Sequence, residues 1–298
     1  MPAMLRSLLL LSCSMAMAIA MPALAAPRAA PIEAIRSALR ANDVEAATAA
    51  AERAVAALPT SADAWYFAAN AYGGMAQQAS VFSKLSWAKQ CREAYEKAVA
   101  LDPRHIDARI GLMQFYLMAP GIAGGGRDKA DAAVTALAAI DAGWGHAARA
   151  MLAQADKDQP AYEREMRAAI AAAPTEPRHR IGFATMYALK QRWTEAFALI
   201  DAGLTLMPGD ARLNYQIGKF AALSGTRLQG GLDALAAAQA APVKADDYSE
   251  GALLWRRAQI LEKLGRKDEA LAGYRRALQQ EPTLKPLVDQ DIERVRKP

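Results

Sequence analysis

The stretch that decides the fold is LWRRAQILEKLGRKDEALAGYRRALQQEP, residues 254–282. It reads as a helix, a tight turn at Gly265 and Arg266, and a second helix that ends at Pro282, because proline cannot continue a helix. Small residues fall where two paired helices must approach closely, and large residues fill the space beside them. The positions that carry this pattern are Leu254, Ala258, Leu261, Ala270, Tyr274, Ala277 and Pro282. The stretch therefore predicts an antiparallel helix pair.

The same layout recurs along the chain. Pro174, Pro208 and Pro242 are spaced by 34 and 34 residues, and each follows an Ala-rich stretch with helical character. Turn residues lie upstream of these prolines, at Gly225 and, in the first unit, at Asn42 and Asp43. We predict about seven such units over residues 32–282, followed by a charged capping helix at residues 284–296, since arrays need a polar end.

These units resemble the tetratricopeptide repeat family. The motif is also matched by Asn214, Gly218, Ala221, Gly230, Ala234, Ala237 and Pro242, and by Trp65, Ala69, Tyr72 and, after about ten extra residues, Cys91, Tyr95, Ala98 and Pro103. Three units are degenerate: residues 32–59, residues 105–141, and the unit that ends at Pro174. The resemblance implies a right-handed α-solenoid that binds proteins.

Composition agrees with an all-α fold. Hydrophobic residues make up 53% of the chain and aromatic residues only 7%, and no run is dense in valine, isoleucine and threonine as strands require. The formal net charge of +5 is small, and the basic residues of the chain are dispersed, which argues against a nucleic-acid partner.

The first 25 residues have the layout of a secretory signal peptide. A single charge at Arg6 precedes an apolar stretch, and Ala23 and Ala25 suit signal peptidase. We expect cleavage after about Ala25, a mature array over residues 26–298, a periplasmic location and no integral membrane segment. A retained anchor and lipidation at Cys13 remain alternatives. The mature chain would keep only Cys91 and form no internal disulfide.

The resemblance implies that first helices line the concave face of the array. Inward positions that combine aromatic residues with arginine, lysine or amides suit a protein or peptide partner. The predicted partner-binding residues are Tyr66, Asn70, Arg109, Tyr116, Tyr215, Lys219, Trp255 and Gln259. An alternative is that several of the aromatic residues pack against neighbouring repeats instead.

A glycine-rich loop over residues 121–127 is the one unusual connection. It lacks the lysine and the serine or threonine of a phosphate-binding loop, and no strand precedes it. We interpret it as a flexible connection with Asp128 as the helix N-cap. The alternative is an anion site formed by the N–H groups of Gly124, Gly125 and Gly126 together with Arg127.

No catalytic or metal-binding motif is present in the sequence. His105, His146 and His179 lie in different units without metal-ligand spacing, and we expect no metal and no cofactor. We therefore predict a non-catalytic scaffold of the cell envelope that binds a protein partner in its concave groove. Two hypotheses stay open beside it: an envelope enzyme or small-molecule-binding protein that uses the 121–127 loop, and a subunit of a homo-oligomer.

Overall fold

The computed structural model describes residues 26–241 and 248–297, and the signal peptide predicted at residues 1–25 lies outside them. Within these ranges the chain forms seven successive helix pairs without a strand, and one further helix. The pairs are α1 (Ala26–Arg40) with α2 (Val44–Ala57), α3 (Ala62–Gln78) with α4 (Val81–Leu101), α5 (Ile106–Met118) with α6 (Arg127–Ala138), α7 (Ala142–Ala155) with α8 (Gln159–Ala172), α9 (Pro177–Leu189) with α10 (Trp193–Leu206), α11 (Ala211–Ser224) with α12 (Leu228–Ala240), and α13 (Glu250–Lys263) with α14 (Lys267–Gln280). The short helix η1 (Gly121–Ala123) precedes α6, and η2 (Pro282–Leu284) leads into α15 (Lys285–Arg296).

The turns within the pairs lie where the sequence predicts them. Asn42, Gly225 and Gly265 adopt left-handed backbone conformations, with φ of 54°, 76° and 77°. The carboxylate of Asp43 accepts the N–H of Ala46 at 2.9 Å and so caps the first turn of α2. These residues end one helix and start the next, which sets the antiparallel arrangement of each pair.

Small residues allow the paired helices to touch. Gly218 of α11 lies so close to α12 that a Cβ atom there would be 2.2 Å from Cγ of Leu235, a distance that no side chain tolerates. Leu235 is fully buried, as is Tyr274 in the last pair. Burial of these large side chains beside small residues is the main source of stability in such a pair.

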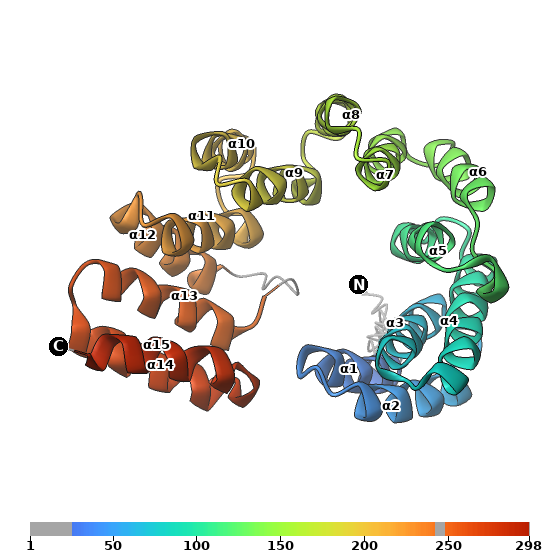
Figure 1. Cartoon of the computed structure of the whole chain (residues 1–298), viewed down its shortest axis with the longest axis horizontal. Helices are drawn as coiled ribbons and strands as arrows, with labels where there is room; N and C mark the ends of the chain where they lie inside the picture. Colours follow the sequence, from blue (N-terminus) through green and yellow to red (C-terminus); the bar gives the residue numbers. More distant parts are fainter. Residues whose placement is uncertain (1–25, 242–247, 298) are drawn as a thin grey trace, which may run out of the picture.

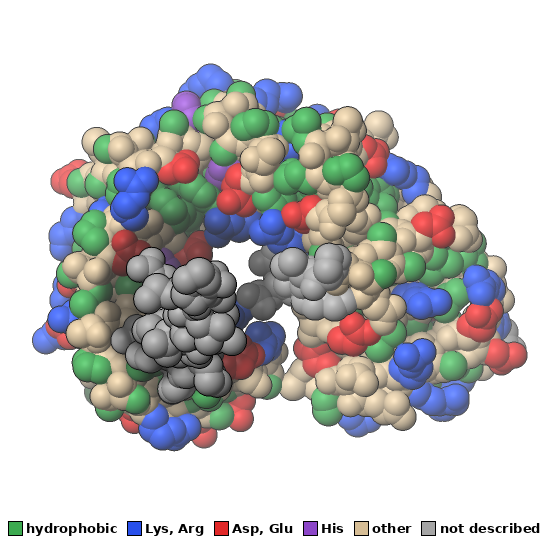
Figure 2. Space-filling view, turned by 180° about the vertical axis from the view of Figure 1, so that it is seen from behind, with side chains coloured by type: hydrophobic (Ala, Val, Ile, Leu, Met, Phe, Trp, Pro, Cys, Tyr) green, Lys and Arg blue, Asp and Glu red, His purple; other side chains and the backbone are tan. Residues whose placement is uncertain are grey.

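The seven pairs curve into a ring-shaped superhelix, in which α5, α9, α11 and α13 lie nearer the centre than α6, α10 and α12 (Figure 1). The space-filling view shows that the centre of the ring is hollow and that Lys, Arg and acidic side chains border the opening (Figure 2). An ion pair of 2.7 Å joins Arg178 of α9 to Asp107 of α5 and so bridges helix pairs that are not consecutive. The first helices therefore provide an inner surface, as predicted.

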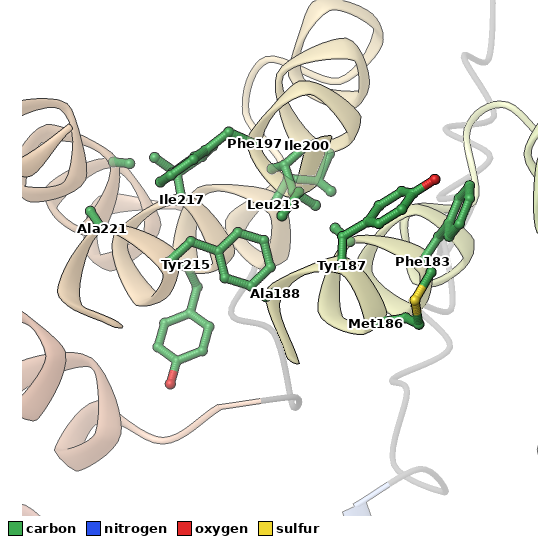
Figure 3. Close-up of a cluster of buried hydrophobic side chains, with 14 of the residues drawn as sticks. Phe183, Met186, Tyr187, Ala188, Phe197, Ile200, Leu213, Tyr215, Ile217 and Ala221 are labelled. Atoms are coloured by element: carbon green, nitrogen blue, oxygen red, sulfur yellow. The ribbon is translucent and has the colours of Figure 1, made fainter. Parts of the chain in front are cut away.

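The helix α15 covers the end of the array, as predicted for residues 284–296. Its Val288 and Val295 are buried in one cluster with Ala258, Tyr274 and Leu261 of the last pair. The largest buried cluster lies further back, around α9, α10 and α11. In that cluster Phe197, Ile200 and Leu213 pack together, whereas Tyr215 points away from them (Figure 3).

Candidate functional site

Two cationic side chains lie close together on the inner surface, Lys219 of α11 and Arg256 of α13. Both are half-buried. Burial and the positive charge of Arg256 lower the pKa of Lys219 from its ordinary value. Among the residues that the structure describes, no carboxylate forms an ion pair with either side chain. We call this pair of cations and the side chains around it the Lys219–Arg256 site.

Aromatic and amide groups surround the two cations. The ring of Tyr215 stacks on that of Tyr248, with centroids 4.1 Å apart and planes inclined by 7°. The guanidinium of Arg256 lies 4.1 Å from the centre of the Trp255 ring and donates a hydrogen bond of 2.8 Å to Gln259. The site thus combines positive charge with flat apolar surfaces.

The site also holds polar atoms whose hydrogen-bonding capacity is unused. Oε1 of Gln216 and Nε of Arg256 are buried, and neither has a hydrogen-bond partner in the described part of the chain. Leaving such groups unpaired is unfavourable, and functional sites are where it is tolerated. A bound group with both donors and acceptors would satisfy them.

The structure brings four of the eight predicted partner-binding residues together here. Tyr215 and Lys219 lie on α11, and Trp255 and Gln259 on α13. Their exposure differs from the prediction, because Tyr215 is only 7% exposed beneath Tyr248. For Tyr215 the structure agrees with the alternative that the aromatic residue packs against a neighbouring part of the array, and its role in partner binding stays a prediction.

Trp255 and Gln259 are also engaged within the chain. Both donate to the carboxylate of Asp291 in α15, at 2.6 Å from Trp255 Nε1 and 3.0 Å from Gln259 Nε2. Asp291 is itself buried. These two residues therefore connect α13 to the capping helix, and their role in partner binding stays a prediction.

The other four predicted residues lie across the ring, on α3 and α5 (Figure 1). All are half-buried and have internal contacts. Asn70 accepts from the Tyr95 hydroxyl at 2.5 Å, Arg109 donates to the carbonyl of Pro103 at 2.5 Å, and Tyr116 donates to Glu96 at 3.0 Å. The ring of Tyr66 lies 5.2 Å from that of His105.

Tyr66 also lines a polar cavity of about 620 Å³ between α1, α3, α5 and α9. Most of the charged groups around this cavity already have partners, including Asp107 and Arg178. Tyr66 thus lies beside a cavity whose charged groups largely neutralise one another.

In the glycine-rich loop, the donors that we considered for an anion site have partners within the chain. The N–H groups of Gly124, Gly125 and Gly126 donate to backbone carbonyls within the chain, at 2.9, 3.2 and 2.8 Å. Arg127 donates to both carboxylate oxygens of Asp156, at 2.5 and 2.8 Å. The donors named for the anion site are thus engaged within the described part of the chain.

The loop also differs from its predicted capping. The N-cap of α6 is Gly126, and Asp128 lies in the first turn of the helix. Gly125 is required for close packing, since a Cβ atom there would be 1.9 Å from the carbonyl oxygen of Ala119. The loop is therefore a compact, closed turn rather than the flexible connection that we expected.

The three histidines have structural contacts. His105 caps α5 through Nδ1, which accepts the N–H of Ala108 at 3.2 Å, and His146 lies 2.9 Å from a carboxylate oxygen of Glu165. His179 is almost fully buried, and burial lowers its pKa. No group of three or more potential metal ligands occurs in the described residues.

Sequence reasoning missed Arg256, Gln216 and Tyr248. Arg256 follows Trp255 directly and precedes Gln259 by three residues, so helical spacing could have placed it on the same face. Tyr248 precedes α13, and its stacking on Tyr215 has no local signal, because the two residues are far apart in sequence.

Two stretches of the chain match the family model for the tetratricopeptide repeat, residues 74–105 and residues 251–284. The second stretch covers α13 and α14, the pair from which the fold was predicted. The chain therefore contains tetratricopeptide repeats, and its described residues form an all-α solenoid. This repeat type is in general a protein-interaction scaffold. Comparison with curated protein sequences gives no match.

Solved structures of similar shape include yeast Tom70, with 14% identity, a TM-score of 0.51, and coverage of 85% of this chain and 54% of that chain. The APC/C hetero-tetramer Cut9-Hcn1 has 14% identity, a TM-score of 0.50, and coverage of 89% and 48%. A tetratricopeptide repeat protein from Parabacteroides merdae ATCC 43184 has 14% identity, a TM-score of 0.46, and coverage of 91% and 99%. The chain thus spans about half the length of the first two, and the likeness concerns the fold alone.

No helix in the described part of the chain combines the length and the apolar character that crossing a bilayer requires.

Proposed function

We propose that this chain is an exported, non-catalytic scaffold of the cell envelope that binds an acidic segment of a partner protein at the Lys219–Arg256 site. The periplasmic location rests on the signal-like layout of residues 1–25. The general role as an interaction scaffold follows from the repeats. The nature of the partner rests on the charges of the inner surface.

The observation that carries the proposal is a pair of neighbouring cations that, within residues 26–241 and 248–297, form no ion pair with a carboxylate. Burial of Lys219, and to a lesser degree its repulsion by Arg256, lowers the pKa of Lys219. A carboxylate from a partner would relieve this repulsion and form charge-assisted hydrogen bonds. Retaining such an unfavourable pair in the free protein is typical of a binding site.

The surrounding groups suit a peptide rather than a small inorganic anion. Tyr248, which stacks on Tyr215, and Trp255, which lies against Arg256, offer flat apolar surfaces, and aromatic residues with arginine are the usual anchors of protein interfaces. The unpaired Oε1 of Gln216 can accept from a peptide N–H, which an inorganic anion does not provide.

The proposal is tested by capture of partners from an envelope extract, followed by mass spectrometry, with three single variants. Lys219→Gln and Arg256→Gln each remove one charge from the site. Arg257→Gln removes the same charge from the next position on α13, which is exposed, and serves as the matched control.

We expect both site variants to weaken binding of the captured partner about thirtyfold or more, since truncating a desolvated charge at an interface costs about 2 kcal/mol at least. The control should bind like the unmodified protein. Lys219→Gln should not lower stability, because it removes a repulsion. Equal binding by Lys219→Gln and Arg257→Gln would place the partner elsewhere on the molecule.

The location is tested separately by N-terminal sequencing of the protein from a periplasmic extract. We expect the mature chain to begin at Ala26. Recovery of the chain only from the cytoplasm, with Met1 still present, would contradict the envelope role. It would not contradict binding at the Lys219–Arg256 site.

A further inference from the structure

Two departures from the repeat period meet at one place in the structure. The first departure is an insertion of about ten residues between Tyr72 and Cys91, which lengthens α4 to 21 residues. The second departure is the loop that contains η1, between α5 and α6. Both line a single pocket of about 640 Å³ between α3, α4 and α5. A regular repeat has neither insertion, so the pocket is a feature of this chain.

The pocket is mainly apolar. Leu85, Phe115, Met118 and Ile122 supply large side chains, and Met118 and Ile122 are 83% and 82% exposed at its rim. Small residues widen the interior, among them Ala76, Ala88 and Gly73, and the buried Cys91 and Tyr95 also contribute to its lining. Its size and lining match those of pockets that hold small molecules, which span about 300–1,000 Å³.

A single charged side chain lines this pocket, that of Lys84. Lys84 is exposed, and within residues 26–241 and 248–297 it takes part in no ion pair. The other polar side chains of the lining are those of Gln77, Gln114, Tyr95 and Cys91. Burial raises the pKa of the Cys91 thiol to about 12, so the interior carries no negative charge at neutral pH.

We propose that this pocket binds a single-chain amphiphile with an anionic head, whose apolar chain lies between α4 and the η1 loop and whose head group pairs with Lys84. The pocket involves α3, α4 and α5 and is separate from the Lys219–Arg256 site on α11 and α13. The proposal therefore stands independently of the proposed partner binding.

An apolar chain fits this lining better than an extended peptide does. The walls are mostly helical, so their backbone N–H and C=O groups are already bonded within the helices. An extended peptide would bury its own backbone groups without partners, which is costly, whereas a methylene chain has no such groups. The exposed rim residues Met118 and Ile122 would close over the chain.

The first test is calorimetric titration of the full chain with decanoate, dodecanoate and tetradecanoate. Each added methylene that enters the pocket should tighten binding about three- to fourfold, until the pocket is full. Dodecan-1-ol and dodecyltrimethylammonium carry the same chain with a neutral and a positive head, and both should bind more weakly than dodecanoate. Failure of dodecanoate to bind would overturn the proposal.

Variants then test where the head group of the amphiphile binds. Lys84→Gln should weaken the binding of dodecanoate about two- to fivefold, as expected for an exposed ion pair, and leave the affinity for dodecan-1-ol unchanged. Lys89→Gln, on the same helix but outside the pocket lining, is the matched control and should have no effect. Equal effects of the two lysine substitutions would contradict the assignment of the head group.

Two further variants block the pocket itself. Ala88→Trp should fill it and abolish binding. Met118→Glu places a negative charge at the exposed rim, where it cannot disturb the core, and should weaken dodecanoate more than dodecan-1-ol. Leu189→Glu, at a position that is likewise 81% exposed but distant, is its control. Unchanged binding by Met118→Glu would show that the amphiphile binds elsewhere.

Cys91 provides a readout within the pocket. Dodecanoate should slow the reaction of Cys91 with a small thiol reagent, measured by mass spectrometry of the peptide that contains it. Lack of protection would contradict binding in this pocket. Protection by an amphipathic peptide, with none by dodecanoate, would also overturn the proposal and identify a protein docking site.

Discussion

The buried carboxylate of Asp291 holds the capping helix on the last repeat, and its removal should loosen the C-terminal end of the array. Oδ2 accepts hydrogen bonds from Trp255 and Gln259, and Oδ1 forms an ion pair of 2.7 Å with Arg294. Asp291→Ala would leave both donors without their acceptor. Arg294 would keep two short bonds to Glu262, at 2.6 and 2.7 Å, and so would not be left unpaired.

The expected loss follows from these contacts. Hydrogen bonds to a charged group contribute about 1.5–3 kcal/mol each, and breaking a buried charge network costs about 3–5 kcal/mol. Because Arg294 retains Glu262, we take the lower end, about 3 kcal/mol of local stability for α13–α15. That corresponds to a roughly hundredfold rise in the equilibrium population of the open form.

Native-state hydrogen exchange is the suitable assay, because a repeat array opens locally rather than as one unit. Amides of α15 should exchange about a hundredfold faster in Asp291→Ala, while those of α5 to α9 stay unchanged. Asp289→Ala removes a half-exposed carboxylate from the same helix that pairs, within the described residues, with Lys285 alone at 2.6 Å, and should change little. Equal exchange of α15 in the two variants would refute the reasoning.

Three further predictions concern the core and the loop. His179→Phe should reduce the loss of stability on acidification, measured by urea unfolding, because burial lowers the pKa of His179 below its ordinary 6.5. The stability that the neutral imidazole contributes is present above pH 6.5 and is lost as the pH falls toward the folded-state pKa. Equal losses in the variant and the unmodified protein would contradict this. Gly218→Ala should destabilise the α11–α12 pair by about 1–3 kcal/mol through overpacking. Gly230→Ala should instead stabilise it by about 0.5–1 kcal/mol, because the added Cβ atom meets nothing within 4 Å. A change of the same sign in both variants would be inconsistent with close packing at Gly218. Gly125→Ala should destabilise the α5–α6 connection by about 1–3 kcal/mol, because it places a Cβ atom against a backbone carbonyl, whereas Gly121→Ala should not. Thermal unfolding of the two variants compares them.

The helix pairs could be predicted from the sequence because their signals are local. The spacing of Pro174, Pro208 and Pro242, and the turn at Gly265, depend on backbone geometry within one unit. The small residue at Gly218 likewise reports a contact with the very next helix. Such features recur in the units that keep the repeat pattern, so the period reveals them.

The exposure of the site residues could not be predicted in the same way. Tyr215 is covered by Tyr248, and Trp255 is bonded to Asp291, which is 36 residues further along. These contacts join successive repeats or the cap, and no periodic pattern encodes them. The loop shows the same limit, since the donors of Gly126 and Arg127 are used by the carbonyl of Tyr116 and by the carboxylate of Asp156.

The position of Trp255 decides which substitution can separate binding from capping. Its indole N–H bonds to Asp291 of α15, and its ring lies beneath the guanidinium of Arg256. Replacing Trp255 would therefore disturb the cap and the Lys219–Arg256 site at once, and a loss of binding could follow from either. Within the described residues Lys219 forms no hydrogen bond or ion pair with α15, and its charge is unfavourable in the free protein. A loss of binding in Lys219→Gln with α15 equally protected from exchange thus reports on the inner surface alone.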